Sequence, residues 1–517
     1  MDAITESSGR PHAYRMQTYY PLIRRRRTSF CLTTPKSQIS IKNKMEDDEL
    51  MIDSNVEKEI SITINDLPDD VLLTIFAYFH PIDLIHRFSL VSRHWNYLAA
   101  HPNFFTEVRV LINDLSLEYG SVKTFFQRIS QHLRKICIDC SIPLPSSQVN
   151  SLFDICCPNV IHLDIGTFKE MNTTLLEKLS SSFPNVKTLH VEKLERSSKD
   201  DHDEKEWKKT LEMLFEDENI FPKMQNLFVG DVTVYCPEYN PKLPACKRPL
   251  NLLHIYKGTV YIDFSRIKTS PWLLTLTELH IESFAKNEHI EYISQLQNLK
   301  VFSWASSRNT YDYEFAHLKK LYNLEELRIW FRYEYSHITT AGLINLFTLP
   351  EKEPNKSFPF KLKHLIFANF FHGSIELFKV IDRNCPNLKT LGLPFNDCLT
   401  YNDVVFTVVK NFKRLIFLDL SSIGCCSNDE AWNNLNDDDL PDLRLLKLHG
   451  SKINIETFQR LNLKRPKLLI STKWNYFINW TETENGYVFH DTFDGDIRAI
   501  VNDLRQIEGL RDFTIDS

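Results

Sequence analysis

Leucine recurs through most of this chain at a fixed place within a short apolar pattern. The pattern is an apolar residue, two variable positions, Leu, one variable position and a second apolar residue, often after Pro-Asn. This alternation predicts a short strand that buries one face. The central residues of the copies are Leu163, Leu189, Leu227, Leu253, Leu279, Phe302, Leu327, Leu365, Leu391, Leu418 and Leu446, with an opening copy at 133–138 and a closing one at 510–515.

The spacing between these central residues is regular. Leu227, Leu253 and Leu279 follow one another at intervals of 26 residues, and the interval from Leu391 to Leu418 is 27. A period of this length is typical of leucine-rich repeats, in which each strand is followed by a returning segment before the next strand lies parallel to it. Several of these segments show helical periodicity. We therefore predict an α/β solenoid, a curved parallel sheet with outer helices.

The repeats are predicted over residues 125–471, and residues 472–517 fit the pattern poorly, as expected for a degenerate terminal repeat or cap. Two intervals are longer, at 38 residues: Leu189 to Leu227 and Leu327 to Leu365. The first contains an acidic, polar run at 197–206 and the second a run with two prolines at 350–356. We expect both runs to be solvated loops, because insertions in solenoids map to one rim.

A different pattern precedes the repeats, at residues 66–97. Large apolar side chains recur there at helical spacing, Pro68 suits a first helical turn, and Pro81 can begin a second helix. A third helical piece carries Trp95. Three short helices cannot bury this much apolar surface among themselves, so we expect a partner to cover the remainder.

The same residues resemble the F-box, over about 62–108. The matching motifs are Leu67-Pro68 before an acidic residue, Ile75-Phe76-x-Tyr78-Phe79, Pro81-x-Asp83-Leu84 and Val91-Ser92-Arg93-x-Trp95. The sequence departs mildly from the family with Asp70 in place of Glu and Ser92 in place of Cys. The resemblance implies docking onto the Skp adaptor of a cullin-based ubiquitin ligase and, through it, association with cullin and RING subunits. The adaptor contacts that it implies are Leu67, Pro68, Ile75, Leu84, Val91 and Trp95.

Composition narrows the function further. The formal net charge of −6 argues against nonspecific nucleic-acid binding by the whole protein. The 11 scattered cysteines indicate a reducing compartment, and no apolar run is long enough to span a membrane. Residues 1–60 read as a disordered tail; Arg24–Arg27 is a candidate nuclear-import or kinase signal, and Met45 an alternative start. We expect a cytoplasmic or nuclear protein, or one found in both places.

Catalytic constellations are missing from the sequence. It contains no Gly-rich phosphate loop, no Gly-x-Ser-x-Gly elbow and no His-Glu-x-x-His motif, and its 18 histidines are spread out. We therefore expect no enzyme activity, no cofactor and no metal. Several histidines fall on or beside repeat strands, where the alternation with Leu places them on the concave face or at its edge.

These features predict a substrate receptor that holds a target protein on its repeats while other ligase subunits perform the chemistry. A non-ligase scaffold and, less favoured, a regulator of a small GTPase stay open as alternatives. Residues next to each inward Leu face the concave side, where aromatic side chains and Arg are typical of binding hot spots. The predicted target-binding residues are Tyr256, His280, Arg328 and Trp330.

Overall fold

The computed structural model describes residues 64–490, and Asn65–Thr492 form one compact unit. Within this range the description omits short internal segments. These are 113–120, 141–143, 169–171, 194–200, 232–241, 244–246, 256–260, 263, 282–288, 306–309, 332–336, 369–373, 394–400, 421–428, 449–453, 474–476 and 484–485. The predictions for residues 1–60, for the closing repeat at 510–515 and for Tyr256 lie outside the described residues.

The chain begins with short helices, as the apolar spacing predicts. Local caps explain where they start. Pro81 opens α2, and the Nδ1 atom of His80 accepts a hydrogen bond from the Ile82 amide at 3.2 Å. Ser92 caps α3, because its Oγ accepts from the Trp95 amide at 3.1 Å. The helical elements are η1 (Ile64–Asp66), α1 (Asp69–Phe76), α2 (Pro81–His86), η2 (Phe88–Leu90), α3 (Arg93–Ala99) and η3 (Pro102–Phe105).

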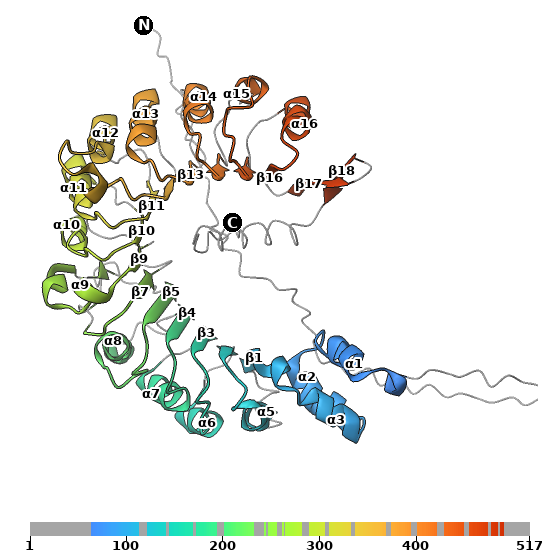
Figure 1. Cartoon of the computed structure of the whole chain (residues 1–517). Coiled ribbons are helices and arrows are strands. Elements are labelled where there is room, and N and C mark those ends of the chain that lie inside the picture. Colours follow the sequence, from blue (N-terminus) through green and yellow to red (C-terminus); the bar gives the residue numbers. More distant parts are fainter. Residues whose placement is uncertain are drawn as a thin grey trace, which may run out of the picture. The chain divides into compact units, whose positions relative to one another are not determined.

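A 16-stranded sheet follows, and it runs in sequence order apart from the short strands β6 and β8 (Figure 1). Every pairing from β1 to β16 is parallel, and β17 and β18 close the sheet as an antiparallel hairpin. The strands are β1 (Glu107–Ile112), β2 (Lys135–Cys140), β3 (His162–Phe168), β4 (Thr188–Lys193), β5 (Asn226–Asp231), β7 (Leu252–Ile255), β9 (Glu278–Ile281), β10 (Val301–Ala305), β11 (Glu326–Trp330), β12 (His364–Ala368), β13 (Thr390–Gly392), β14 (Phe417–Asp419), β15 (Leu445–Lys447), β16 (Leu469–Lys473), β17 (Phe477–Thr483) and β18 (Gly486–His490). β6 (Lys242–Leu243) pairs only with β8 (Tyr261–Ile262).

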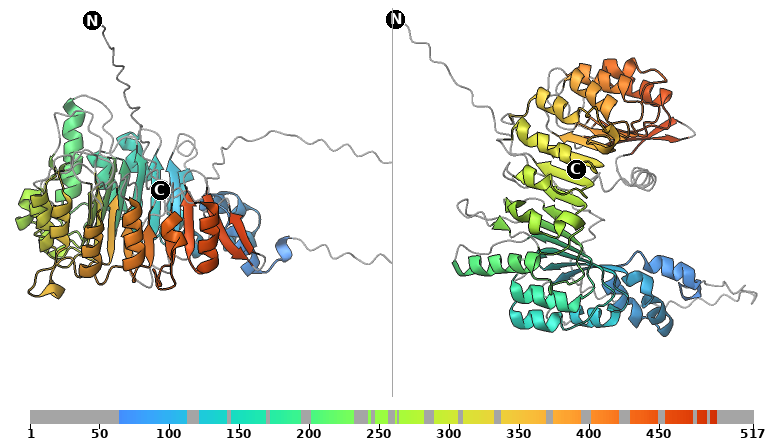
Figure 2. Two further views of the ribbon diagram at one scale, coloured as in Figure 1. Left: turned by 90° about the horizontal axis from the view of Figure 1, so that it is seen from above. Right: turned by 60° about the vertical axis from the view of Figure 1, so that its left-hand side comes forward.

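Helices return the chain between these strands and line the convex side of the curved sheet (Figures 1 and 2). They are α5 (Ser121–Ile129), α6 (Ser146–Leu152), α7 (Thr173–Ser182), α8 (Asp201–Glu216), η4 (Phe264–Thr269), α9 (Trp272–Thr275), α10 (His289–Ile293), α11 (Asp312–Ala316), η5 (His317–Lys320), α12 (Thr340–Phe347), η6 (Pro354–Lys356), α13 (Ile375–Asn384), α14 (Tyr401–Asn411), α15 (Asp429–Asn433) and α16 (Ile455–Lys464). The predicted leucine-rich-repeat solenoid, with a curved parallel sheet and outer helices, is confirmed.

The repeat leucines form the core in the predicted strand register. Leu227, Leu253 and Leu279 are direct partners on neighbouring strands, and each side chain is fully buried. Leu327, Leu365 and Leu391 continue the same row and are also fully buried. No repeat has a core of its own, so this continuous apolar row holds adjacent repeats together.

The structure differs from the sequence-based expectations in two places. Asp201–Glu216 forms helix α8, so the predicted loop at 197–206 is wrong from Asp201 onward. The reason is tertiary packing, since Leu211, Leu214 and Phe215 on the same helix are buried in the core. The sheet also begins before the predicted repeat boundary at residue 125, because β1 pairs in parallel with β2.

Candidate functional site

The N-terminal helices enclose a small aromatic core. Phe76 is fully buried, and its ring centroid lies 5.1 Å from that of Trp95 and 5.3 Å from that of Phe88. The indole nitrogen of Trp95 donates to Asn65 Oδ1 at 3.1 Å, so its polar atom is satisfied. Leu84 lies in the same buried cluster. These contacts fix the three helices around one another without using the outer surface.

The six predicted adaptor contacts divide between this core and the surface. Leu84 and Trp95 are buried, and Leu67 and Ile75 are half-buried against the core. Pro68 is exposed, and Val91 is 59% exposed. Leu84 and Trp95 therefore lie inside the domain, and the other four side chains present atoms to solvent.

Exposed apolar side chains are concentrated on these helices. Among the described residues, the large hydrophobic side chains that are most exposed include Tyr78 at 86%, Leu90 at 79% and Tyr97 at 76%. Seven of the sixteen exposed large hydrophobics lie in this short segment: Ile64, Val71, Tyr78, Phe79, Leu90, Val91 and Tyr97. The sequence-based expectation that a partner covers the remaining apolar surface fits this distribution.

The helical segment is joined to the sheet by shared packing. Ile85 and Phe105 belong to the core of the repeats, and Phe104 packs against both hydrophobic clusters. The Nε2 atom of His80 lies 3.1 Å from the Arg109 carbonyl oxygen on β1. A surface on the helices is thus connected to the first strand through buried side chains and not only through a linker.

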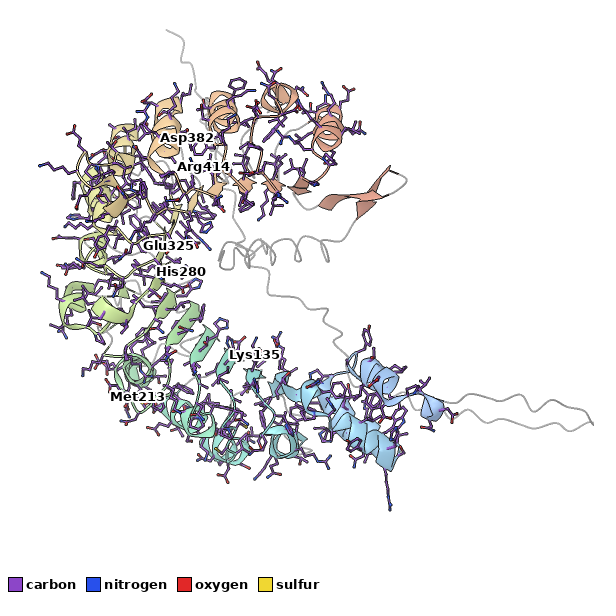
Figure 3. All side chains as sticks on the ribbon, viewed as in Figure 1. Lys135, Met213, His280, Glu325, Asp382 and Arg414 are labelled. Atoms are coloured by element: carbon purple, nitrogen blue, oxygen red, sulfur yellow. The ribbon has the colours of Figure 1, made fainter. Side chains whose placement is uncertain are left out.

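The concave face carries one row of side chains that crosses every repeat. Position by position, the strands pair His190 with Phe228, Phe228 with His254 and His254 with His280. Their ring centroids are separated by 5.9, 5.7 and 4.9 Å in turn, so the four rings form a continuous ladder. Figure 3 shows His280 on the inner side of the sheet and Met213 on the outer helical side.

The row changes character along the sheet. Before the ring ladder the row holds Arg109, Cys137 and Asp164. Arg109 contacts Asp139, two residues after Cys137 on β2, at 2.6 Å, and Asp164 contacts His190 at 2.9 Å. Beyond the ladder it passes through Ser303 to Arg328 and then to Ile366 and Gly392. The row then reaches Asp419 and Lys447 on β14 and β15, so it carries charged residues toward both ends, and its aromatic part lies in the middle repeats.

Arg328 is held in place by a buried acidic residue. It forms an ion pair with Glu326, which is only 2% exposed and lies two residues earlier on β11. Burial raises the pKa of Glu326, and Arg328 opposes that rise by favouring the carboxylate. The pair fixes the guanidinium on the concave face before any partner binds.

Two imidazoles beside this pair are kept neutral. Burial, together with His254 and Arg328, holds the pKa of His280 well below its ordinary value. Burial, with Arg328 and Lys363, lowers the pKa of His364 to about 3, and its Nδ1 lies 3.0 Å from Thr390 Oγ1. At neutral pH these two imidazoles consequently add no positive charge beside the Arg328 guanidinium.

The remaining predicted target residues are placed as follows. Trp330 ends β11 two residues after Arg328 and is 40% exposed. His280 is half-buried in the ring ladder. Tyr256 lies outside the described residues. The structure thus puts His280, Arg328 and Trp330 on the same face of neighbouring repeats, with one strand, β10, between them.

Two cysteine thiols on or beside the first repeats have raised pKa values. Burial, with Asp164 and Asp139, raises the pKa of the Cys137 thiol, and burial, with Cys156, raises the pKa of Cys157 to about 12. Such thiols are not activated nucleophiles, since the thiolate is the reactive form. No cluster of three metal-binding side chains occurs in the described part of the chain, and none of its helices is long and apolar enough to cross a membrane.

A known family model matches the segment that contains the N-terminal helices. The F-box-like family model matches residues 64–110. The chain carries an F-box-like domain followed by a leucine-rich-repeat domain. The F-box-like domain therefore contains the aromatic core and the exposed apolar side chains described above, and the ring ladder and Arg328 belong to the repeat domain.

Similar solved structures are distant in sequence. An internalin (inlF) from Listeria monocytogenes is 15% identical, with a TM-score of 0.38, covering 76% of this chain and 97% of that chain. Yeast Rad7, solved in complex with Elc1, is 14% identical, with a TM-score of 0.39, covering 78% of this chain and 92% of that chain. No curated protein matches the chain in sequence. Likeness at this level supports no inference about partners.

Proposed function

We propose that this chain is the substrate-recognition subunit of a cullin-based ubiquitin ligase. The F-box-like domain docks on a Skp-type adaptor, which brings cullin and RING subunits, and the repeat domain binds a target protein. The observation that carries the proposal is the exposure of Tyr78, Leu90, Val91 and Tyr97 on the domain that matches the F-box-like model. Apolar surface of this kind is costly in water unless a partner covers it.

The mechanism is positioning. Ubiquitin transfer takes place on other subunits, so this chain supplies geometry and no nucleophile. Holding a target lysine near the charged ubiquitin carrier makes the transfer effectively intramolecular. The shared packing of Ile85, Phe104 and Phe105 supports this role, because it couples the adaptor-docking domain to the first repeat.

The target is proposed to bind the concave face at Tyr256, His280, Arg328 and Trp330. Arg328 is pre-positioned by Glu326, and Trp330 offers a partly exposed indole next to it. Arg and Trp are enriched among residues that dominate binding energy, and prior ordering of the guanidinium lowers the entropy lost on binding. Of the predicted patch, these two residues have the strongest structural support.

Affinity purification tests the proposal as a whole. The intact chain and a Leu67→Ala/Pro68→Ala variant are recovered from cells with and without proteasome inhibition. We expect adaptor and cullin with the intact chain only, and ubiquitinated proteins that accumulate with it under inhibition. Adaptor recovery without cullin would instead favour the non-ligase scaffold.

A further inference from the structure

A second surface lies on the edge of the sheet where the strands begin. Each repeat has a segment that leads from its helix into the next strand, and parallel strands place all these segments on one edge. Over β10 to β14 they are residues 294–300, 317–325, 348–363, 385–389 and 412–416. Together they contain ten Lys or Arg side chains and three carboxylates. The cations are Lys300, Lys319, Lys320, Lys352, Lys356, Lys361, Lys363, Lys389, Lys413 and Arg414.

This basic edge contrasts with the protein as a whole, whose formal net charge is −6. It is also bounded, because the next segment along the edge contains Asp437, Asp438, Asp439 and Asp442. The excess of positive charge is therefore confined to five repeats. A field of one sign over such a stretch attracts a partner of the opposite charge.

The backbone of the repeats sets the spacing of these cations. Hydrogen bonds between consecutive segments run from the Lys300 amide to Thr277, from Glu325 to Lys300, from Lys363 to Glu325 and from Lys389 to Lys363. The residues are therefore neighbours in one row, at the separation of adjacent strands, about 4.8 Å. Glu325 is neutralised within the row, since its carboxylate contacts Lys363 Nζ at 2.8 Å.

A second row lies two residues earlier in each segment. Its side chains change from asparagine to Lys or Arg at some repeats along the edge. Asn298 and Asn323 use their side-chain amides to donate to the carbonyl of the preceding turn, at 2.9 and 2.8 Å. Lys361 takes this position in the next repeat, and its Nζ donates to Asn323 Oδ1 at 2.7 Å. Arg414 occupies it two repeats later. Lys361 and Arg414 thus occupy the position that Asn298 and Asn323 occupy in the preceding repeats.

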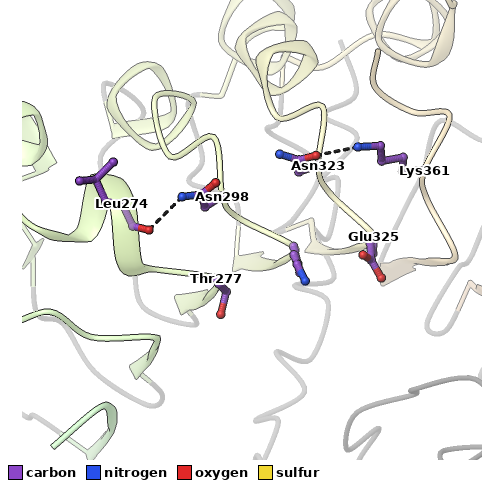
Figure 4. Close-up of a pocket in the computed structure, with 7 residues that line it drawn as sticks. Leu274, Thr277, Asn298, Asn323, Glu325 and Lys361 are labelled. Carbon is purple, nitrogen blue, oxygen red and sulfur yellow. Dashed lines mark hydrogen bonds between the residues drawn. The ribbon is translucent and has the colours of Figure 1, made fainter. Parts of the chain in front are cut away.

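A hollow of about 280 Å³ opens between these rows (Figure 4). Lys300 and Lys361 both line it, and Leu274 forms a 74% exposed apolar lip. The other lining residues are Thr277, Asn298, Asn323 and Glu325, whose carboxylate is paired with Lys363. The Lys300 ammonium makes no hydrogen bond or ion pair with the described residues, whereas Lys361 uses one donor on Asn323. The hollow therefore presents unused ammonium donors from two strands that flank β11.

We propose that this edge, centred on Lys300 and Lys361, binds an acidic segment of a partner protein. Carboxylates would pair with the two ammonium groups, and an apolar side chain of the segment would contact Leu274. A protein segment is favoured over single-stranded nucleic acid because, among the described residues, no aromatic side chain lines the hollow, and nucleic-acid sites of this kind use aromatic stacking. That this partner is the target of the ligase rests on the proposed function. The pairing of carboxylates with Lys300 and Lys361 does not.

Fluorescence anisotropy with the full chain tests this inference. The probes are a labelled twelve-residue peptide of alternating Glu and Gly, the same peptide with Gln in place of Glu, and twelve-residue oligothymidylate. The variant is Lys300→Glu/Lys361→Glu. Lys209→Glu/Lys379→Glu on helices α8 and α13 is the matched control, because both lysines are exposed, make no described side-chain contact and undergo the same charge change.

The expected result is binding of the Glu peptide by the intact chain and by the control, weakened by salt, with the Gln peptide unbound. The Lys300→Glu/Lys361→Glu variant should bind at least tenfold more weakly, and Lys300→Arg/Lys361→Arg should retain binding. Equal binding by variant and control, no binding by the intact chain, or tighter binding of oligothymidylate would each overturn the proposal. Adaptor binding measured on the same samples keeps this outcome separate from the proposed function.

Discussion

The imidazole rings of His254 and His280 lie on adjacent strands of the concave face, with their centroids 4.9 Å apart. The pKa of His280 is held well below its ordinary value by burial, by His254 and by Arg328. His280 is therefore uncharged at neutral pH. Protonation of His280 would place a buried cation near the Arg328 guanidinium, so acid should disturb this part of the face.

For His364, the loss of folding stability in acid can be given a magnitude. Its pKa falls from 6.5 to about 3 on folding, so below pH 6.5 the unfolded chain binds a proton that the folded chain does not. Stability should be unaffected above pH 6.5 and should decline as the pH falls from there toward 3. At pH 5 the loss from this residue is about 2 kcal/mol.

Urea unfolding of the intact chain and of His364→Gln, at pH 7.5 and pH 5.0, measures that loss. The variant should lose about 2 kcal/mol less than the intact chain between the two pH values. The same loss in both proteins would show that His364 is not the neutral buried group described above.

The repeat core predicts opposite effects for two leucines that are close in sequence. Leu279 is fully buried, whereas Leu274 is 74% exposed. Truncation of a buried Leu to Ala costs about 2–5 kcal/mol, and a buried charge costs more. Leu279→Asp should lower the melting temperature strongly or cause aggregation, and Leu274→Asp should change it little. A fully stable Leu279→Asp protein would contradict the strand register.

Two substitutions in the F-box-like domain should likewise separate an effect on stability from an effect on docking. Leu84→Ala removes a fully buried side chain and should destabilise the protein by about 2–5 kcal/mol. Val91→Asp changes a side chain that is 59% exposed, so it should leave the melting temperature unchanged and abolish adaptor co-purification. If Val91→Asp retains the adaptor, the docking surface lies elsewhere on the domain.

The target patch is best tested at Trp330. Arg328→Glu would set a second carboxylate beside the buried Glu326, so loss of target after that change would not distinguish contact from misfolding. Trp330→Ala avoids this problem and should reduce recovery of ubiquitinated targets, with adaptor binding and melting temperature retained. Tyr313→Ala, at a side chain that is 66% exposed, is the control. Unchanged target recovery would move the patch away from Trp330.

Periodicity alone was sufficient to predict the repeat core. The inward positions of Leu189, Leu279, Leu327 and Leu391 depend only on strand alternation, and all four are buried. The same alternation placed His254, His280 and Arg328 correctly on one row. The sequence could not show how deeply each side chain on that face is buried, because the burial of Glu326 and His364 depends on neighbouring strands.

Other features depend on distant contacts and were missed for that reason. Helix α8 has an acidic start that resembles a loop, yet Glu206 accepts a hydrogen bond from the Thr173 amide at the start of α7, at 3.1 Å. Leu84 and Trp95 match the F-box pattern, but only the packing around Phe76 shows that they are buried. The basic edge joins segments from five repeats, so no single stretch of sequence displays it.

Direct binding of purified proteins tests the central claim, that the F-box-like domain docks on a Skp-type adaptor. Isothermal titration calorimetry would compare the intact chain with the Leu67→Ala/Pro68→Ala variant, after equal melting temperatures show that both are folded. We expect a one-to-one complex with the intact chain and no measurable heat with the variant. Undiminished binding by the variant, or no binding by the intact chain, would contradict it.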